Sequence, residues 1–143
     1  MKLLLTLAAG AALCAGSARA ADPQAPLPSQ IFPWNPEAAV PSKTGSRRIM
    51  FNQPTATMNL FHCHISVLNP GQNTGAPHRH PQEELVIVKE GTLQVNLDGK
   101  LQTATTGAMI FYAANENENM TNIGTAPATY YVLQVVTDKT PKN

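Results

Sequence analysis

Apolar and polar residues alternate with a period of two along most of the chain, which is the pattern of β-strands with one buried face. This alternation predicts strands at residues 47–52, 57–69, 84–89, 108–113 and 128–137. The segment ELVIVK at residues 84–89 is apolar on both faces, so we expect this strand to be covered on both sides. No stretch has convincing helical periodicity, and the pattern therefore predicts an all-β fold.

Turn residues separate the predicted strands. The segment TLQVNLDGKLQTA at residues 92–104 places Asp98 and Gly99 between two alternating runs, and this pair tolerates the positive φ angles of a tight hairpin. Residues 70–77, PGQNTGAP, predict a loop, and residues 115–122, NENENMTN, predict a polar connection. Short strands joined by regular turns indicate a β-sandwich or a small barrel.

The first 20 residues have the features of a secretory signal peptide. Lys2 precedes an apolar stretch at residues 3–16, and small residues stand at Ala18 and Ala20. We expect cleavage after Ala20 and a periplasmic or secreted location. A lipoprotein anchor at Cys14 is the disfavoured alternative, because the residue before it is a bulky leucine.

Residues 21–44 contain six prolines, which exclude a regular helix and favour extended, poorly paired backbone. We expect an N-terminal arm whose apolar residues Ile31, Phe32 and Trp34 are buried against the rest of the protein or a partner subunit. The β-domain is expected at residues 45–140. The chain of 143 residues is long enough for one such domain with its own core.

Charge and cysteine content exclude several classes of partner. Without Lys2 and Arg19, the chain has eight basic and nine acidic residues, a net charge of −1, and no basic stripe. Nucleic acid and anionic membranes are therefore not expected partners. Cys63 is the only cysteine beyond the signal sequence, so no internal disulfide is possible, and its place in an alternating strand predicts a buried, unreactive thiol.

A cluster of candidate ligands follows the predicted loop. His78 and His80 are one residue apart, so they point the same way on extended backbone, and Glu84 begins the next strand. If the chain bends at Pro81, two imidazoles and one carboxylate converge and can hold a divalent metal on one side, leaving positions open for a substrate. A bare pair of histidines in a loop is otherwise weak evidence for a metal site.

These residues resemble the first motif of the cupin superfamily, in which a glycine, two spaced histidines, a glutamate and a second glycine follow one another. His78, His80, Glu84 and Gly91 match this motif, while Gly71 stands one residue early. The resemblance covers roughly residues 58–136 and is closest to the small single-domain bacterial cupins. It implies a double-stranded β-helix, or jelly-roll barrel, a metal centre, a small-molecule ligand and frequent homodimers.

The chain departs from the second cupin motif. Counting from Gly107, the proline position holds Ala113, the metal-binding histidine position holds Glu118, and the last position holds the expected Asn122. Three interpretations stay open: Glu118 replaces the histidine as a ligand, Glu118 points to solvent, or the site holds no metal. In the first, two histidines, two carboxylates and a divalent ion sum to zero charge, which favours manganese or iron, with zinc or nickel also possible.

A second spaced pair, His62 and His64, lies on the predicted strand at residues 57–69, on the face opposite Cys63. Since the face of Cys63 resembles a core face, we expect these two histidines to face solvent or a partner subunit. A ligand role for His64 is the lesser alternative.

The function class stays open between enzyme, binding module and assembly protein, because the cupin fold carries many chemistries. The resemblance implies a metal-dependent oxidoreductase of dioxygenase type, or an isomerase, acting on a small oxygen-rich substrate chelated to the metal. The alternative is a metal-free cupin that binds a sugar or small acid without catalysis. The sequence assigns no catalytic residue; Glu118, if it is not a ligand, is the one candidate base.

Overall fold

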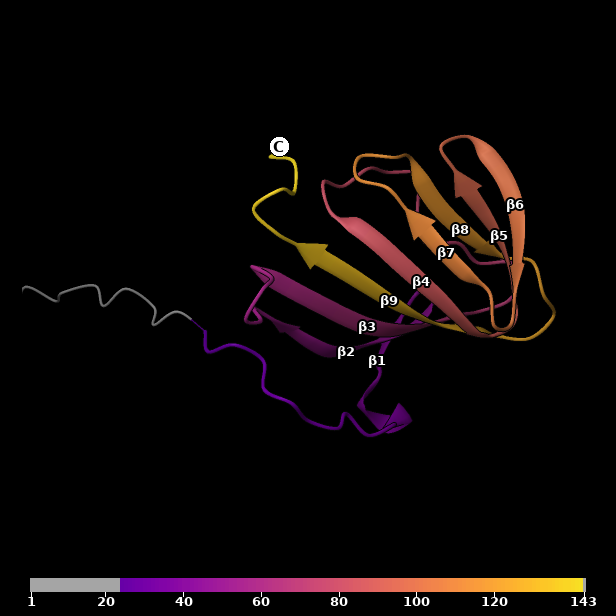
Figure 1. The fold of residues 1–143 in the computed structure, drawn as a ribbon. Helices are drawn as coiled ribbons and strands as arrows, with labels where there is room; N and C mark the ends of the chain where they lie inside the picture. Colours follow the sequence, from indigo (N-terminus) through magenta and orange to yellow (C-terminus); the bar gives the residue numbers. More distant parts are fainter. Residues whose placement is uncertain (1–23, 143) are drawn as a thin grey trace, which may run out of the picture.

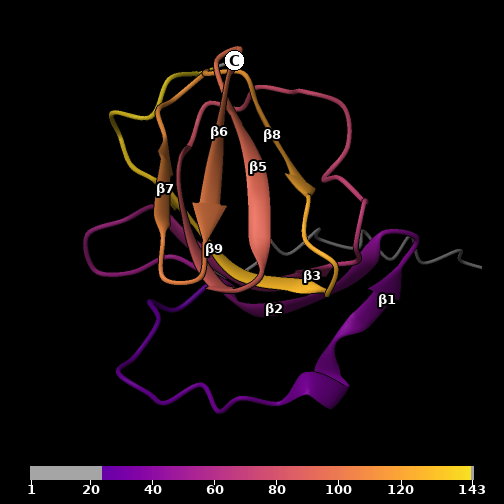
Figure 2. The same ribbon diagram turned by 90° about the vertical axis from the view of Figure 1, so that its right-hand side faces the viewer.

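Two antiparallel sheets face each other across the core of the protein in a jelly-roll arrangement (Figures 1 and 2). The computed structural model describes residues 24–142, so the predicted signal peptide at residues 1–20 lies outside the described residues. The larger sheet has the order β1-β2-β3-β9-β4-β7, and the smaller has the order β6-β5-β8. Within residues 24–142, no helix is long and apolar enough to cross a membrane.

Strand bounds follow the predicted pattern closely. The strands are β1 (Val40–Ser42), β2 (Gly45–Gln53), β3 (Leu60–Leu68), β4 (Glu83–Glu90), β5 (Thr92–Leu97), β6 (Lys100–Thr105), β7 (Met109–Tyr112), β8 (Glu118–Asn122) and β9 (Ala128–Val136). The all-β expectation is thus confirmed. The one described helix is a three-residue 3-10 turn, Pro36–Ala38, and β1 lies within the range expected for the arm.

The prediction of a polar connection at residues 115–122 is wrong, because its second half is strand β8. Glu118, Met120 and Asn122 are buried on alternate positions of this strand, and it pairs antiparallel with β5. The composition misled, since the inward-facing residues of β8 include a carboxylate and an amide in place of aliphatic side chains. This strand brings Glu118 into the interior.

The hairpin between β5 and β6 is confirmed. Asp98 has φ 47° and Gly99 has φ 92°, and these positive angles at both central residues match the right-handed twist of the paired strands. The side-chain oxygen of Asn96 accepts a hydrogen bond of 2.8 Å from the Gly99 amide, which closes the turn. Leu97 and Lys100 are paired across it.

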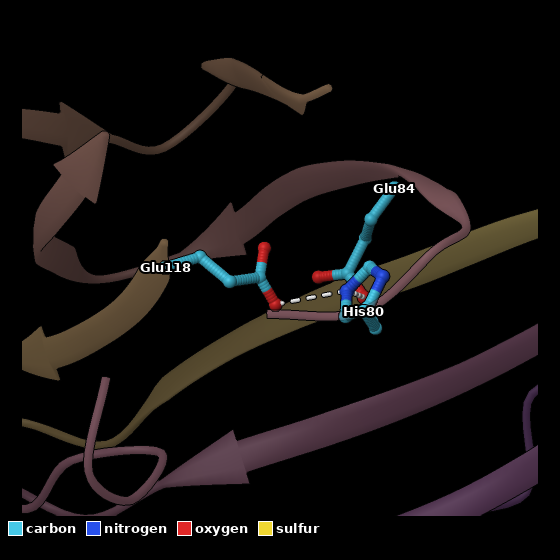
Figure 3. A group of neighbouring side chains, drawn as sticks. All are labelled: His80, Glu84 and Glu118. Atoms are coloured by element: carbon cyan, nitrogen blue, oxygen red, sulfur yellow. Dashed lines mark hydrogen bonds and ion pairs between the residues drawn. The ribbon is translucent and has the colours of Figure 1, made fainter. Parts of the chain in front are cut away.

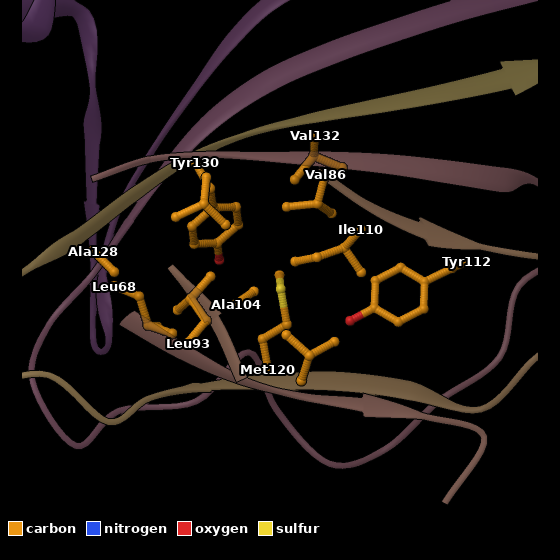
Figure 4. Packing of buried hydrophobic residues seen from close by; sticks show 12 residues of the cluster. Leu68, Val86, Leu93, Ala104, Ile110, Tyr112, Met120, Ala128, Tyr130 and Val132 are labelled. Carbon is orange, nitrogen blue, oxygen red and sulfur yellow. The ribbon is translucent and has the colours of Figure 1, made fainter. Parts of the chain in front are cut away.

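Side chains from both sheets form one apolar core (Figure 4). Its members are Leu68, Val86, Val88, Leu93, Val95, Ala104, Ile110, Tyr112, Met120, Ala128, Tyr130 and Val132. At Gly91, which has φ 101°, an added Cβ would lie 2.6 Å from the Ala128 side chain, so only glycine allows this approach of β4 and β9. Several core residues, among them Leu68, Met120 and Val132, also line a cavity between the sheets.

Asn122 fastens the end of β8. Its side chain is fully buried and donates to the carbonyls of Leu68, at 2.7 Å, and Ala126, at 2.9 Å. Its side-chain oxygen accepts from the Gly124 amide at 2.9 Å. All the polar atoms of the buried amide are thereby used, which fixes β8 relative to β3.

Residues ahead of β1 contact the outer face of the larger sheet. Phe32 packs on Phe51 with ring centroids 5.0 Å apart, and Trp34 packs on Tyr131 at 6.5 Å. Ile31 is 90% and Trp34 49% exposed, so the expected burial of these two residues against the barrel is wrong. Arg48 donates to the Asn35 carbonyl at 2.6 Å. Cys63 is a buried free thiol, as expected, and burial raises its pKa, so the thiolate is disfavoured.

Candidate metal centre and its cavity

A cavity of about 320 Å³ opens between the two sheets beside the apolar core. The larger sheet contributes residues of β2, β3, β4 and β9 to its wall, and β8 contributes residues of the smaller sheet. The charged and hydrogen-bonding side chains that matter for chemistry are Arg47, His64, His78, Glu84, Glu118 and Gln134. Acidic and basic side chains therefore line the same cavity.

Three of the predicted residues come together, and two of them, Glu84 and Glu118, line this cavity. The donor atoms of His80, Glu84 and Glu118 all lie within 4.8 Å of one another (Figure 3). His80 Nε2 lies 3.1 Å from Glu118 Oε1 and 3.6 Å from Glu84 Oε2. His80 stands in the segment before β4, Glu84 in β4 and Glu118 in β8, so the group joins the two sheets. These are distances at which a single cation contacts all three groups after small shifts.

Backbone pairing explains how Glu118 reaches His80. The amide of Glu118 donates to the His78 carbonyl at 2.9 Å, and the amide of His78 donates to the Glu118 carbonyl at 3.0 Å. The Asn115 amide also donates to the His80 carbonyl at 2.8 Å. Asn115 has φ 63°, a left-handed conformation that asparagine tolerates well, and it turns the chain into β8.

Burial makes the ionised forms of Glu84 and Glu118 energetically unfavourable. The pKa of Glu84 is raised, first by burial and then by the neighbouring charge of Glu118. The pKa of Glu118 is raised by burial, against the opposing effect of His80 and His78. Gln134 donates a hydrogen bond of 2.7 Å to Glu84 Oε2 and favours its ionised form. A positive charge between the two carboxylates would remove most of this cost.

The polar atoms of the group fit a cation. Glu118 Oε2 and His80 Nδ1 are buried and have no hydrogen-bond partner among the described residues. Buried carboxylate oxygens are normally paired, and an orphan oxygen beside a second carboxylate is the arrangement that a bound divalent ion satisfies. Two oxygen ligands and imidazole nitrogen are a donor set for manganese, iron or zinc.

His78 lies at the mouth of the cavity. Its side chain is 52% exposed, and its Nε2 lies 3.5 Å from Glu118 Oε1. Its Nδ1 is 3.2 Å from the Ala76 carbonyl, which can only accept, so Nδ1 carries the proton in that bond. Nε2 then has a free lone pair directed to the carboxylate side, which is the tautomer that a metal-binding histidine needs.

The structure decides one of the interpretations of Glu118. Its side chain is 5% exposed and points toward His80, so the interpretation in which it points to solvent is wrong. The cause is the missed strand β8, whose alternation turns residue 118 inward. The metal-ligand interpretation and the metal-free interpretation both remain.

The expectation for His62 and His64 is also wrong. Both side chains are buried, with 7% and 9% exposure, and His64 lines the cavity. The face of β3 that carries Cys63 lies on the outside of the barrel and is buried there by other residues. The opposite face, which carries His62 and His64, therefore points into the barrel. Because both faces of β3 are buried, apolar alternation alone misidentified its inner face.

Arg47 is a functional candidate that the sequence did not single out. Its Nη2 lies 3.2 Å from His62 Nε2 and 3.1 Å from His64 Nδ1, across the pair β2–β3. Burial first, and then the charge of Arg47, lower the pKa of both histidines, that of His64 to about 3. Only the strand register, with Arg47 opposite Ser66, could have revealed this cluster.

Tyr112 and Tyr130 complete the wall between core and cavity. Both are buried, and burial raises the pKa of Tyr130 to about 12 and that of Tyr112 further, so both hydroxyls keep their protons at neutral pH. The Tyr112 hydroxyl has no hydrogen-bond partner among residues 24–142. Both tyrosines also belong to the apolar cluster.

Comparison with known families gives one match. The family model described as "Cupin domain" matches residues 64–134, which span β3 to β9 and include all four proposed ligands. No protein in a search of curated sequences matches the chain significantly.

Solved structures resemble the fold. A cupin 2 conserved barrel domain protein from Salinispora arenicola has a TM-score of 0.62 and 17% identity, with 79% of this chain and 92% of that chain covered. An RmlC-like cupin from Shewanella frigidimarina has a TM-score of 0.60 and 17% identity, with 78% and 95% covered. At this identity these two structures show a shared fold alone.

A third structure has higher identity over a shorter region. It is described as a sugar phosphate isomerase from a cupin superfamily of Silicibacter pomeroyi, with 29% identity and a TM-score of 0.50. The match covers 54% of this chain and spans about half of that protein, 51% of its length.

Proposed function

Since this chain belongs to the cupin superfamily as a small single-domain member, we propose that it binds a divalent metal ion through His80, Glu84 and Glu118. His78 is the proposed fourth ligand, at the open side. The observation that carries the proposal is the meeting of two buried carboxylates and an imidazole within 4.8 Å, in a cavity.

Charge balance supports a cation at this place. Two ionised carboxylates in a largely desolvated site repel each other, and both of their pKa values are raised. Protonating one of them or binding a cation relieves that repulsion. The unpartnered Glu118 Oε2 favours the cation, because no described residue donates a hydrogen bond to this buried oxygen.

Manganese or iron is the proposed ion. Hard carboxylate oxygens make up half of the proposed ligand set, and with two neutral imidazoles the centre has no net charge. Zinc and nickel also accept these donors and are the alternative ions.

The proposed activity is that of an oxidoreductase of dioxygenase type, or an isomerase, on a small oxygen-rich substrate. When bound, the metal polarises an oxygen that chelates it and can activate dioxygen. The chain's own residues bind and orient the substrate: Gln134 holds Glu84 in place, and the protonated Tyr112 hydroxyl has a free donor near both carboxylates. Of the two activities, isomerisation is supported by the similarity to the isomerase from Silicibacter pomeroyi, which extends over about half of that protein's length.

A binding protein without metal is the rival function. In that case at least one of Glu84 and Glu118 is protonated, and the cavity of about 320 Å³ holds a sugar or small acid by hydrogen bonds. The raised pKa values of both carboxylates are compatible with this state as well.

Metal analysis of the purified protein separates the two functions. We expect close to one equivalent of manganese or iron by plasma mass spectrometry after growth with these metals. Glu118→Ala should lose most of the metal, and Glu118→His should regain it, because an imidazole restores a nitrogen ligand at the same position.

Glu83→Ala and Glu116→Ala are matched controls, since Glu83 is exposed and neither residue belongs to the group of His80, Glu84 and Glu118. Both controls should keep the wild-type metal content. Full metal retention in Glu118→Ala would overturn direct ligation, and a metal-free wild-type protein that binds a sugar would favour the rival function.

Export is a further proposal, supported by Lys2, the apolar residues 3–16 and the small residues Ala18 and Ala20. Mass spectrometry of protein from the periplasm or medium should give an N-terminus at Ala21. An intact N-terminus in the cytoplasm would contradict it.

A homodimer is proposed as the assembled state. Met109 and Phe111 of β7, at the edge of the larger sheet, are 66% and 58% exposed. Burying such apolar side chains against a second copy is favourable. Light scattering should give twice the monomer mass, and Phe111→Glu should lower it; a monomeric wild-type protein contradicts the proposal.

A further inference from the structure

Arg47, His62 and His64 form a basic cluster, and two of them, Arg47 and His64, line the cavity together with the acidic residues. Arg47 lies on β2, and both histidines lie on β3. Arg47 and His64 line the same cavity as Glu84 and Glu118. The proposed metal centre makes no use of this cluster.

Proton counting fixes one tautomer of the cluster and limits the other. The Asn52 side-chain oxygen can only accept, so His62 carries its proton on Nδ1, from which it donates to Asn52 Oδ1 at 3.1 Å. His62 Nε2 is then a lone pair that accepts from Arg47 Nη2 at 3.2 Å. His64 has two states: Nδ1 accepts from Arg47 Nη2 at 3.1 Å, or Nδ1 carries the proton and donates to His62 Nε2 at 2.9 Å.

The two imidazoles also contact each other, with His62 Nε2 and His64 Nδ1 only 2.9 Å apart. In the first state both nitrogens are lone pairs, and the two protons of Arg47 Nη2 offset their repulsion. In the second state His64 Nδ1–H donates to His62 Nε2, which also lies against Arg47 Nη2. The guanidinium is therefore held in one orientation by its Nη2, as part of a fixed side-chain network.

The rest of the guanidinium has no partner. Within residues 24–142, neither Nε nor Nη1 of Arg47 makes a hydrogen bond, and no carboxylate lies within 4.0 Å of this side chain. His64 Nε2 likewise has no hydrogen-bond partner among these residues, and it is a donor when Nδ1 accepts from Arg47. Arg47 is exposed, so these donors contact solvent and are free to bind a planar oxyanion that enters the cavity.

The surroundings match such a ligand in size and polarity. Ser42, Thr44, Ser46 and Ser66, on or beside β1 to β3, also line the cavity, and Thr74 lines it beside β8. A volume of about 320 Å³ is at the small end for ligand sites, so it limits the ligand to a few functional groups.

We propose that Arg47 and His64 form an oxyanion subsite, and that the ligand of this cavity is a small acid whose carboxylate or phosphate binds there. Under the proposed function, the hydroxyl or carbonyl end of the same acid points toward the metal. Only this orientation rests on the proposed function; the oxyanion subsite does not. His62 is a positioning residue, since it orients Arg47 and does not line the cavity.

Calorimetry on metal-free full-length protein tests the subsite separately from the metal. The probes are glycolate and inorganic phosphate, with glycolamide as the uncharged match of glycolate. We expect both anions to bind and glycolamide to bind at least tenfold more weakly. Arg47→Gln should weaken both anions about tenfold or more, while its metal content stays at the wild-type level.

Lys43→Gln, at an exposed position ahead of β2, is the control for a general loss of charge and should bind both anions like the wild type. Arg47→Lys keeps the charge but loses the fork, so it should weaken glycolate at least threefold even if Arg47→Gln does not fold. Preference for glycolate or phosphate distinguishes the two kinds of acid.

Equal binding of glycolate and glycolamide, or wild-type affinity for the anions in both Arg47 variants, would overturn the proposal. A failure of the metal centre leaves these results unchanged, because the titration uses metal-free protein. Loss of metal in His80→Ala with anion binding intact would support two separate subsites.

Discussion

The chain contains two pairs of histidines with identical spacing, and the structure gives them opposite surroundings. His78 and His80 lie beside the carboxylates of Glu84 and Glu118. His62 and His64 lie beside the guanidinium of Arg47. The first pair is placed to share a cation with acids, and the second pair is placed where a cation is repelled.

Spacing alone therefore does not assign a role to such a pair. In both cases the residue between the two histidines keeps their side chains on one side of the backbone. What differs is the charge supplied from a neighbouring strand: β8 brings a glutamate to the first pair, and β2 brings an arginine to the second. Long-range strand pairing, not local sequence, decides which pair can bind metal.

Removing one histidine from each pair should give the largest contrast. His80→Ala removes a proposed ligand, and we expect metal affinity to fall about 100-fold or more. Replacing a residue that only orients a metal ligand costs at most about 100-fold, so the expected loss equals or exceeds that value. His64→Ala should change metal affinity less than threefold. Competition titrations with a chelating dye measure both. Equal losses in the two variants would remove the distinction between the pairs.

Within the first pair, the two histidines should differ. His78 is half exposed and lies 3.5 Å from Glu118, whereas His80 is mostly buried and contacts both carboxylates. We therefore expect His78→Ala to weaken metal binding about tenfold, less than His80→Ala does. The same dye titration checks this order. A larger loss of affinity in His78→Ala than in His80→Ala would contradict it.

In metal-free protein, the ionisable groups at the two histidine pairs should change the free energy of unfolding with pH in opposite directions. Burial raises the pKa values of Glu84 and Glu118 above 4.5, so folding favours their protonated forms. Their contribution is greatest below pH 4.5 and is lost as pH rises through the raised pKa values. Burial and Arg47 lower the pKa of His64 from 6.5 to about 3, so its contribution is complete above pH 6.5 and is lost as pH falls toward 3.

Each proton gives a slope of at most about 1.4 kcal/mol per pH unit. Urea unfolding of metal-free protein at several pH values measures the slopes. Glu118→Gln should flatten the curve above pH 4.5, and His64→Gln should flatten it below pH 6.5. Exchange of these two effects, or an unchanged curve in both variants, would contradict the assigned surroundings.

Local patterns predicted most of the fold. The period of two located the strands, and the Asp98–Gly99 hairpin followed from backbone chemistry at two residues. Strand β8 was missed because its buried positions include Glu118 and Asn122, which a hydrophobic pattern does not register. The cupin resemblance, by contrast, singled out position 118 through motif spacing, even though the strand around it was not recognised.

The basic cluster could not be predicted from the sequence. Arg47 is 15 residues from His62, and their contact depends on the register of β2 against β3, which shifts at a bulge between Ile49 and Phe51. The inner face of β3 was equally hidden, because Cys63 and Ile65 on its other face are buried as well. A strand buried on both sides has no alternation to show which side faces the cavity.

Anomalous X-ray diffraction from crystals grown with manganese would test the metal centre most directly. The account predicts one strong manganese peak in contact with His80 Nε2 and with carboxylate oxygens of Glu84 and Glu118, and no peak beside Arg47. A peak between His62 and His64, or no peak near Glu118 at full manganese saturation, would contradict it.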